Sequence, residues 1–426
     1  MDKRISPASR LEGSVLLPGD KSVSHRYAMI SAIAEGKSKL HNYSTGADCQ
    51  STLYCLRGLG IEWTKDGNVV EIEGRGLDGL RAPLANLDAG NSGSTIRMIS
   101  GILAAQPFTS TLEGDESLSR RPMERVMKPL REMGANLEAR DGKYPPLTIH
   151  GGPLKPIEYT LPVASAQVKS CVLLAGLFAP GATTVNEAIV TRDHTELALR
   201  EFGAEVTSRR GAITVQGRPT LTGKELLVPG DISSSAFFLV AACIIPGSRL
   251  LMRAVGLNPT RTALIDFLVA MGAKIRVVDV KSTGGELVGN IEITGGDITG
   301  GTIEGATTAA LIDEIPVLAV LGARSRNGLT VKDASELRVK ETDRIATVAD
   351  NFQRMGVTVE TAADGFHIPG GQKFAAAELD SCGDHRIAMA FSVAALAAEG
   401  DCTIHNAEAA SVSYSEFFDT LHALRA

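Results

Sequence analysis

The chain has 426 residues, which is long for one hydrophobic core, so its length predicts two domains. Apolar residues make up 44% and charged residues 22%, an ordinary balance for a globular protein. The formal net charge of −6 argues against a nonspecific nucleic-acid binder, so any anion site must be local.

Other global features narrow the class further. The first residues lack the apolar stretch of a signal peptide, and no apolar run approaches the roughly 18 residues of a membrane span, so we expect a cytoplasmic protein. The six cysteines form neither a CxxC pair nor a metal-ligand spacing with histidine. We expect them to be small buried side chains in a reducing compartment, and we expect no metal site.

The first predicted helix follows a Pro-Gly-Asp step that recurs later in the chain. Residues 16–36 read LLPGDKSVSHRYAMISAIAEG, and residues 227–247 read LVPGDISSSAFFLVAACIIPG. Serines at these helix starts are expected to cap them, and helix N-termini attract anions. Only the first copy carries Lys21, His25 and Arg26, so the first copy is expected to bind ligand and the second to remain mostly scaffold.

Similar elements recur along the whole chain. Polar segments precede apolar helices at 19–26, 90–97, 165–170, 230–235, 311–316 and 383–386. Helices that end in glycine and turn into a strand are predicted at 56–62, 130–138, 199–206, 268–275 and 352–359.

The recurrence predicts six compact units in two halves. The last return helix, at 413–426, ends the chain, so its strands must come from the N-terminus. We therefore expect a discontinuous domain of residues 1–17 plus 230–426 and an inserted domain of residues 18–229, with the Pro-Gly-Asp segments as crossovers.

Each polar segment alone has an ordinary structural explanation. Asp313 and Glu314 lie within the predicted apolar helix 310–323. A salt bridge to an arginine would be enough to explain carboxylates in such an apolar helix. The run 339–344 could be a solvated helix face, and His385 a helix cap. Together, however, the cations, carboxylates and helix starts predict a cleft between the halves for polyanionic ligands. No P-loop, metal-ligand motif or nucleophile elbow is present, which favours acid–base addition or elimination.

The motifs PGDKSVSHR, AGNSGSTIR, RRPM, SAQVKS, LIDEIP, VKETDR and GDHRIAM occur in order between about residues 12 and 424. Together they make the chain resemble the 5-enolpyruvylshikimate-3-phosphate synthase family, in its class II-like bacterial branch. The resemblance implies an α/β fold: a two-domain inside-out α/β barrel with three βαβαββ units in each domain. It also implies a monomer without a cofactor.

The resemblance implies transfer of the enolpyruvyl group of phosphoenolpyruvate to the 5-hydroxyl of shikimate 3-phosphate, with release of phosphate. The implied contacts to shikimate 3-phosphate are Lys21, Ser22, Arg26, Ser165, Ala166, Gln167, Arg192, Asp313 and Lys340. The implied contacts to phosphoenolpyruvate are Lys21, Gly93, Arg121, Gln167, Arg344 and Arg386.

Carboxylates suit the two proton transfers that this reaction needs. Our hypothesis is that Asp313 deprotonates the 5-hydroxyl, that Glu341 with Lys21 handles the methylene proton, and that His385 assists by hydrogen bonding.

Three positions bear on differences within the family. Glu336 stands where some members have asparagine, and Val412 where some have a ligand-binding lysine, a cation that Lys169 or Arg120 could replace. Gly93 leaves space where alanine would intrude, so competitive inhibition by glyphosate is expected.

Two alternatives remain. The related enolpyruvyl transferase acting on UDP-N-acetylglucosamine usually has a Lys-Asn pair in the first motif and a catalytic cysteine in a loop, whereas this chain has Lys21-Ser22 and no cysteine within 109–125. A non-catalytic phosphometabolite-binding relative would have lost its acids, but Asp313 and Glu341 are present.

Overall fold

The computed structural model describes residues 1–425, which form two compact units. Unit 1 contains Met1–Pro18, Gly230–Lys281 and the chain from Leu287 onward. Unit 2 contains Gly19–Pro229 and the short segment Ser282–Glu286. Each unit encloses its own cluster of buried hydrophobic side chains and so has a core of its own.

The Pro-Gly-Asp segments are where the chain passes from one unit to the other. In unit 2 the Asp20 N–H donates to the Pro229 carbonyl over 2.7 Å, and in unit 1 the Asp231 N–H donates to the Pro18 carbonyl over 3.0 Å. Gly19 has no substitute here, because a Cβ would lie 1.8 Å from the carbonyl oxygen of residue 42.

Aspartate, not serine, caps the helix that follows each segment. The Asp20 side chain accepts from the Val23 N–H over 3.0 Å, and the Asp231 side chain accepts from the Ser233 N–H over 2.8 Å. The prediction of serine caps was therefore wrong at both helices. A carboxylate satisfies the same backbone donors and also complements the positive end of the helix dipole.

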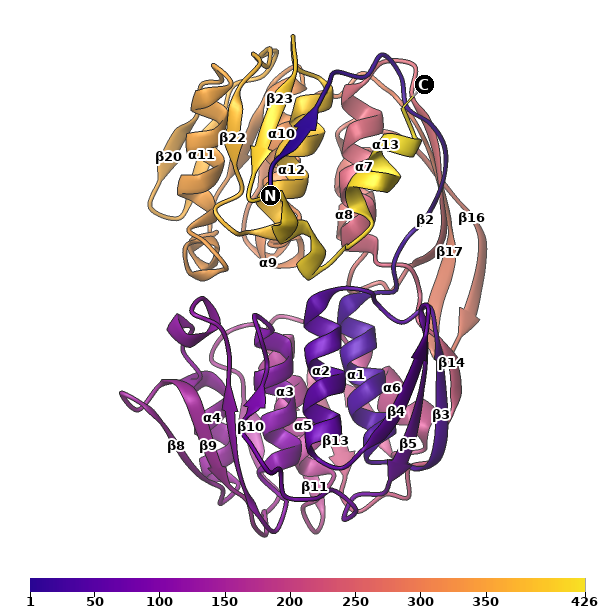
Figure 1. Cartoon of the computed structure of the whole chain (residues 1–426), viewed down its shortest axis with the longest axis vertical. Helices are drawn as coiled ribbons and strands as arrows, with labels where there is room; N and C mark the ends of the chain where they lie inside the picture. The colour runs from indigo at the N-terminus through magenta and orange to yellow at the C-terminus, as the bar shows by residue number, and fades with distance from the viewer. Residues whose placement is uncertain (426) are drawn as a thin grey trace. The chain divides into compact units, whose positions relative to one another are not determined.

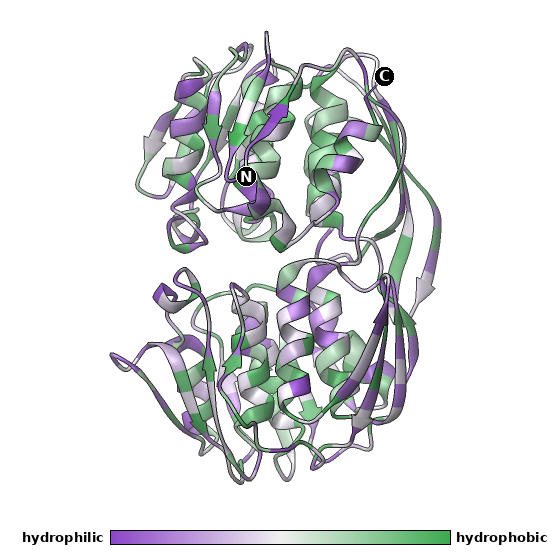
Figure 2. Cartoon of the chain, viewed as in Figure 1, coloured by the Kyte–Doolittle hydropathy of each residue, from purple (hydrophilic) through white to green (hydrophobic). Residues whose placement is uncertain are grey.

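Three almost fully buried helices form the centre of unit 1: α7 (Ile232–Ile244), α10 (Ile315–Arg324) and α12 (His385–Leu396). They pack against one another in pairs, and Figure 1 shows them together inside the unit. Figure 2 shows that they are apolar along most of their length, as expected for helices buried on every side.

Unit 2 is built around α1 (Lys21–Ala32), α3 (Gly93–Leu103) and α5 (Ala166–Gly176). Helices α3 and α5 are in close contact, because a Cβ at Gly101 would lie 2.2 Å from the Cys171 carbonyl oxygen. The outer helices of unit 2 are α2 (Ala47–Gly58), α4 (Glu124–Glu132), α6 (His194–Phe202) and the 3-10 turn η1 (Leu118–Arg120).

The sheets of unit 2 share one strand order. In each spatial order, the strand written first pairs parallel with the second, and the third pairs antiparallel with both the second and the fourth. The orders are β14-β3-β5-β4, β6-β7-β9-β8 and β10-β11-β13-β12. The bounds are β3 Glu35–His41, β4 Glu62–Asp66, β5 Val69–Arg75, β6 Leu87–Asp88, β7 Thr109–Glu113, β8 Asn136–Arg140, β9 Tyr144–His150, β10 Glu158–Thr160, β11 Ala182–Asn186, β12 Val206–Arg209, β13 Ala212–Gln216 and β14 Glu225–Leu227.

Unit 1 repeats this arrangement with one incomplete sheet. Its orders are β16-β17-β15-β2, β18-β19-β21-β20 and β1-β23-β22. The bounds are β1 Lys3–Ile5, β2 Glu12–Leu16, β15 Arg249–Gly256, β16 Lys274–Thr283, β17 Glu286–Thr294, β18 Gly301–Ile303, β19 Leu329–Val331, β20 Glu360–Ala362, β21 Gly365–Ile368, β22 Glu378–Asp380 and β23 Cys402–His405. The remaining helical elements are α8 (Ala263–Ala270), α9 (Ala306–Leu311), η2 (Ser335–Val339), α11 (Arg344–Arg354), η3 (Ala407–Val412) and α13 (Phe417–Ala423).

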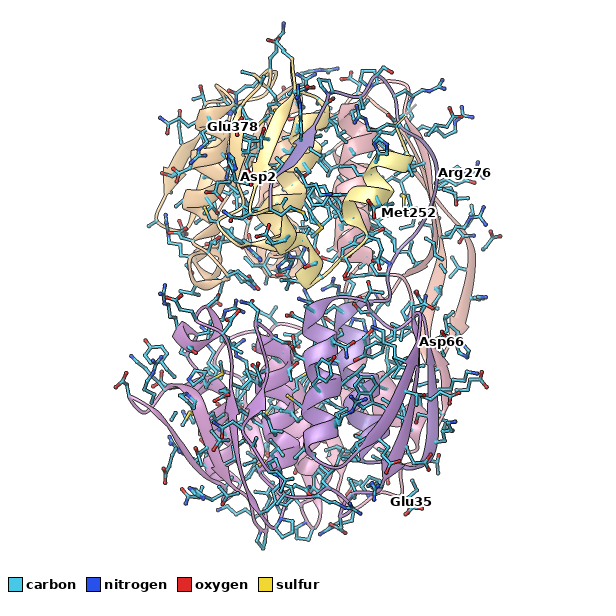
Figure 3. The ribbon with its side chains drawn as sticks, in the orientation of Figure 1. Asp2, Glu35, Asp66, Met252, Arg276 and Glu378 are labelled. Atoms are coloured by element: carbon cyan, nitrogen blue, oxygen red, sulfur yellow. The ribbon has the colours of Figure 1, made fainter. Side chains whose placement is uncertain are left out.

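The N-terminal strands join two sheets of unit 1. Strand β1 pairs antiparallel with β23, and β2 pairs parallel with β15. In the β2 sheet Met252 of β15 is buried in the core, whereas Arg276 of β16 reaches outward and pairs with Glu292 over 3.4 Å (Figure 3). Helices inside and repeated βαβαββ sheets outside confirm the expected inside-out α/β fold.

Two local expectations were wrong. The apolar segment 310–323 is not one helix, because α9 ends at Leu311 and α10 begins at Ile315. Pro316 in the first turn of α10 explains this break, since proline cannot donate to a preceding helical turn. Five of the six cysteines are buried, but Cys382 is exposed in a turn with φ of +51°.

Candidate active site

The polar side chains predicted to bind ligands gather at helix starts in both units. In unit 2 the Lys21 ammonium, in the first turn of α1, donates to Asp48 Oδ2 over 2.8 Å. Asp48 lies in the first turn of α2, and its side chain is only 8% exposed. The carboxylate thus holds the lysine ammonium near the starts of two helices, a position that suits anion binding.

Arg26, one turn further along α1, is buried and fully engaged inside unit 2. Its Nε donates to the Thr195 hydroxyl over 2.6 Å, its Nη1 to the Ser22 carbonyl over 2.8 Å and its Nη2 to the Ser170 hydroxyl over 2.8 Å. Burial lowers the pKa of Arg26 to about 10 despite the opposing effect of Glu196. Arg26 therefore joins α1, α5 and α6, and Arg192 Nη1 meets the neighbouring Ser22 hydroxyl at 3.4 Å.

His25 lies on the inner side of α1. Its Nδ1 is 2.7 Å from the Thr52 hydroxyl, which is itself 2.7 Å from the Thr95 hydroxyl at the start of α3. Burial, together with Lys21 and Arg26, lowers the pKa of His25 well below its ordinary value, so the ring is neutral at pH 7. This chain of polar contacts links α1, the middle of α2 and the first turn of α3.

Helices α3 and α5 bring a second group together in unit 2. Gln167 accepts from Arg97 Nη1 over 2.9 Å and donates to the Ser94 hydroxyl over 2.9 Å. Ser165 caps α5 by accepting from the Val168 N–H, which places residues 166 and 167 in the first turn.

Gly93 begins α3 beside two guanidinium groups. A Cβ at this position would lie 2.8 Å from Arg97 Nη1 and 3.6 Å from Arg121 Nη1. Arg121 is held by the Asn91 side chain over 2.8 Å and by the Ser117 hydroxyl over 3.0 Å. The absence of a side chain at residue 93 keeps this patch of positive charge uncrowded.

In unit 1 the turn between α9 and α10 brings Asp313 to two cations. Asp313 Oδ1 lies 3.4 Å from Lys340 Nζ and 3.8 Å from Arg344 Nη1. The Glu341 carboxylate pairs with Arg344 Nη2 over 2.6 Å. The structure thus brings Asp313 next to Lys340, Glu341 and Arg344, which lie well beyond it in the sequence.

Arg344 is buried among carboxylates. Its Nε donates to Asp384 Oδ2 over 2.8 Å, and Asp384 is completely buried. Burial alone would lower the pKa of Arg344, but Asp384 and Glu341 outweigh it and raise that pKa. Arg344 Nη1 is buried, and within residues 1–425 it has no hydrogen-bond partner. This nitrogen is an available donor for an anionic ligand.

Arg386 approaches the same turn from the start of α12. Its Nη1 donates to the Asp313 carbonyl over 2.7 Å and to the Ser233 hydroxyl over 2.8 Å. The neighbouring His385 ring is buried, with Nδ1 4.0 Å from Asp384 Oδ1. Lys340, Arg344 and Arg386 therefore contact the turn that holds Asp313, while Glu341 pairs with Arg344 and His385 lies beside Asp384.

Sequence reasoning missed the carboxylates that hold these cations. Asp48 had no local signal, because its partner Lys21 is 27 residues away. Asp384 precedes the predicted His385 and Arg386, and its capping position in GDHR was a usable signal, since its side chain accepts from the Arg386 N–H.

The two proposed replacement cations lie in different surroundings. Lys169 is completely buried in unit 2 and lies 2.8 Å from Glu196 and 3.2 Å from Glu187. Arg120 is largely exposed and pairs with Glu116. Lys169 was therefore predicted wrongly as a ligand-binding cation, because its charge is compensated inside the core.

Comparison with known proteins identifies the family. The model of the EPSP synthase (3-phosphoshikimate 1-carboxyvinyltransferase) family matches residues 5–421. The chain belongs to the EPSP synthase family. A 3-phosphoshikimate 1-carboxyvinyltransferase of Solibacter usitatus is 65% identical over 424 residues, covering 100% of both chains. One from Koribacter versatilis is 54% identical over 420 residues, covering 98% of each.

Solved structures of this EPSP synthase family agree with the sequence relatives. A structure of EPSP synthase from Acinetobacter baumannii matches with a TM-score of 0.89 at 42% identity, covering 100% of this chain and 98% of that one. The chain is therefore an enzyme of this family. Within residues 1–425 no helix is long and apolar enough to cross a membrane, and no cluster of three metal-ligating side chains occurs.

Proposed function

We propose that the polar residues of both units act on one pair of substrates, phosphoenolpyruvate and shikimate 3-phosphate. Family membership carries the reaction: the enolpyruvyl group passes to the 5-hydroxyl of shikimate 3-phosphate, and phosphate is released. The observation that supports an anion site most strongly is the buried Arg344 Nη1 beside Asp313, which lacks a hydrogen-bond partner within residues 1–425.

Phosphoenolpyruvate is assigned to the arginines. A guanidinium presents paired donors that match a carboxylate or phosphate. Arg386 uses only Nη1 in hydrogen bonds within residues 1–425, so its Nε and Nη2 remain for the ligand. The proposed set is Lys21, Gly93, Arg121, Gln167, Arg344 and Arg386.

Shikimate 3-phosphate is assigned to helix starts and to cations of both units. Ser165 to Gln167 occupy the first turn of α5, where backbone N–H groups favour a phosphate. Arg26 contributes by fixing the Ser22 carbonyl, because its own nitrogens all donate inside unit 2. The proposed set is Lys21, Ser22, Arg26, Ser165, Ala166, Gln167, Arg192, Asp313 and Lys340.

The chemistry is an addition followed by an elimination. The 5-oxygen bonds to C2 of phosphoenolpyruvate as its proton passes to Asp313, and C3 gains a proton from Glu341 with Lys21 assisting. The C2–O bond to phosphate then breaks as C3 returns its proton to Glu341, and the proton held by Asp313 passes to the departing phosphate. Lys340 and Arg344 beside Asp313 stabilise its charged form, so Asp313 can act as the base. His385, buried at the start of α12, assists by hydrogen bonding.

Three further assignments belong to this proposal. Glyphosate competes for the phosphoenolpyruvate site, because Gly93 leaves the neighbouring guanidinium groups uncrowded. The protein acts as a monomer, and it acts in the cytoplasm. Light scattering with the purified protein tests whether it is a monomer. Fractionation of cells that produce the chain tests whether it is cytoplasmic.

The experiment that tests the function is an assay of phosphate release. The purified chain is mixed with both substrates and then with each alone, and the organic product is identified by mass spectrometry. We expect release of phosphate only when both are present, with one enolpyruvyl adduct formed per phosphate. Release from phosphoenolpyruvate alone, or none at all, would contradict the proposal.

A further inference from the structure

The second Pro-Gly-Asp segment is more than scaffold, because its first serine contacts a ligand-binding arginine. Ser233 lies in the first turn of α7, and its hydroxyl accepts from Arg386 Nη1 over 2.8 Å. The same hydroxyl donates to Glu314 Oε1. Ser233 is only 3% exposed, so no bulk water competes for these contacts.

The hydroxyl stands between two opposite charges. Glu314 Oε1 lies 3.8 Å from Arg386 Nη1, just beyond direct hydrogen-bonding distance. A serine hydroxyl has one proton and two lone pairs, so it can donate to the carboxylate while it accepts from the guanidinium. Both roles are used here.

Glu314 is a buried carboxylate with other partners. Arg261 Nη2 lies 3.9 Å from Glu314 Oε1 and also 3.9 Å from Asp231 Oδ1, and all three residues are almost fully buried. Arg261 therefore keeps a second counter-charge if Glu314 becomes neutral. Without Ser233, Glu314 Oε1 would face two guanidinium groups at similar distances, Arg386 Nη1 at 3.8 Å and Arg261 Nη2 at 3.9 Å, and of these two only Arg386 is assigned to the substrate.

We propose that Ser233 is a positioning residue that keeps Glu314 and Arg386 at the 3.8 Å of a loose ion pair and prevents a direct hydrogen bond between them. It holds the guanidinium by one nitrogen and leaves Nε and Nη2 free to bind phosphoenolpyruvate. This inference rests on the proposed role of Arg386. A direct Glu314–Arg386 pair would pull the guanidinium toward Glu314 and make the carboxylate compete with the anionic substrate.

The test compares the variants Ser233→Ala, Glu314→Gln and the double variant in steady-state kinetics. Loss of a hydrogen bond to a charged group predicts that Ser233→Ala raises KM for phosphoenolpyruvate about tenfold. KM for shikimate 3-phosphate should change less than about twofold. In the double variant the competing charge is absent, so KM for phosphoenolpyruvate should return to within about threefold of wild type.

The matched control is Ser235→Ala. Ser235 lies on the same helix, is completely buried and donates to the Ile232 carbonyl over 2.6 Å, away from Arg386. Thermal unfolding of all variants monitors folding. Failure of Glu314→Gln to restore KM in the Ser233→Ala background, or an equal rise of KM in Ser235→Ala, would overturn the inference.

Arg386→Lys separates failure of this inference from failure of the proposed function. If Arg386→Lys leaves KM for phosphoenolpyruvate unchanged, the assignment of Arg386 to that ligand is wrong, and the inference falls with it. If Arg386→Lys raises KM strongly but Ser233→Ala does not, only the role of Ser233 is wrong.

Discussion

Asp313 lies close to three positively charged side chains. Its carboxylate faces Lys340 and Arg344, while its main-chain oxygen accepts from Arg386. An ionised acid with cations on one side is suited to accept a proton from a substrate hydroxyl held nearby. The turn between α9 and α10 places both the side chain and the carbonyl.

Asp313→Asn tests this role. The amide keeps the shape but cannot take a proton, so we expect kcat to fall by about 100-fold or more. Phosphate release at saturating substrates measures the effect. Asp297→Asn is the control, because that carboxylate is exposed in the same unit and pairs with Arg326. Near-normal turnover of Asp313→Asn would remove Asp313 from the proton transfer.

Gly93→Ala tests the uncrowded position at the start of α3. The new Cβ would lie 2.8 Å from Arg97 Nη1, so that guanidinium must shift and the space near Arg121 shrinks. Overpacking of this kind typically costs about 1–3 kcal/mol, so we expect the glyphosate concentration for half inhibition to rise about tenfold or more. An inhibition titration against phosphoenolpyruvate measures it.

The control for this substitution is Gly152→Ala, because a Cβ at Gly152 would meet no atom within 4 Å. Glyphosate should inhibit Gly152→Ala at the same concentration as it inhibits the wild-type protein. Equal sensitivity of Gly93→Ala and wild type would show that space at Gly93 does not govern glyphosate binding.

At the scale of elements, the sequence predicted recurring helices and strands in six units, and the family resemblance supplied their βαβαββ order. Helix starts capped by polar residues and helix ends marked by glycine are local signals, and the sixfold recurrence made them reliable. The break before α10 was missed because apolar periodicity continues across it. Pro316 was the available local signal.

The partners within the site were less predictable. Motifs indicated which cations cluster, but not which carboxylates hold them. Lys21 meets Asp48, Arg386 meets Ser233, and Lys169 meets two buried glutamates through contacts that depend on how helices pack. Spacing along one helix gives no information about such pairs, so Lys169 could be mistaken for a ligand-binding cation.

Asp384 joins two elements of unit 1 and provides a pH-dependent test. Its carboxylate caps α12 and pairs with Arg344 at the start of α11. Burial would raise the pKa of Asp384, but Arg344 outweighs that effect and holds the pKa below its ordinary value. In the unfolded chain the pKa of an aspartate is about 3.9. Because the pKa of Asp384 is lower than this in the folded protein, its ionised carboxylate stabilises the fold at pH values above about 3.9, and this stabilisation is lost as the pH falls through the folded-state pKa.

Asp384→Asn should therefore destabilise the protein at pH 7. Asparagine caps a helix about as well as aspartate, so the substitution isolates the charge. Removing one partner of a buried ion pair predicts a loss of about 3 kcal/mol in the free energy of unfolding. Urea unfolding should show this difference between pH 7 and about pH 5, and a smaller one below about pH 4.

Asp401→Asn serves as the control for Asp384→Asn. Asp401 pairs with Arg4 at the surface, so its removal should change stability much less. A difference between wild type and Asp384→Asn that does not vary with pH would contradict the proposed charge effect.

At the scale of the whole molecule, chain order and structural unit do not coincide. The hairpin of β16 and β17 belongs to unit 1, but its tip, Ser282–Glu286, belongs to unit 2. The Gly284 carbonyl accepts from the Tyr27 hydroxyl over 3.2 Å, and Glu286 Oε1 lies 2.6 Å from His194 Nδ1. The tip thus contacts α1 and α6.

Glu286→Ala should therefore weaken unit 2, although residue 286 follows most of that unit by more than 50 positions in the sequence. His194 and Glu286 are 3% and 2% exposed, so removing the carboxylate takes away a buried partner and should cost about 1–3 kcal/mol. Hydrogen exchange should show faster exchange in α6 and α1 and no change in α7, α10 and α12.

Glu292→Ala is the control, because Glu292 lies on the same strand but pairs with exposed Arg276. If Glu286→Ala instead speeds exchange mainly in unit 1, the tip stabilises the hairpin itself and not α6.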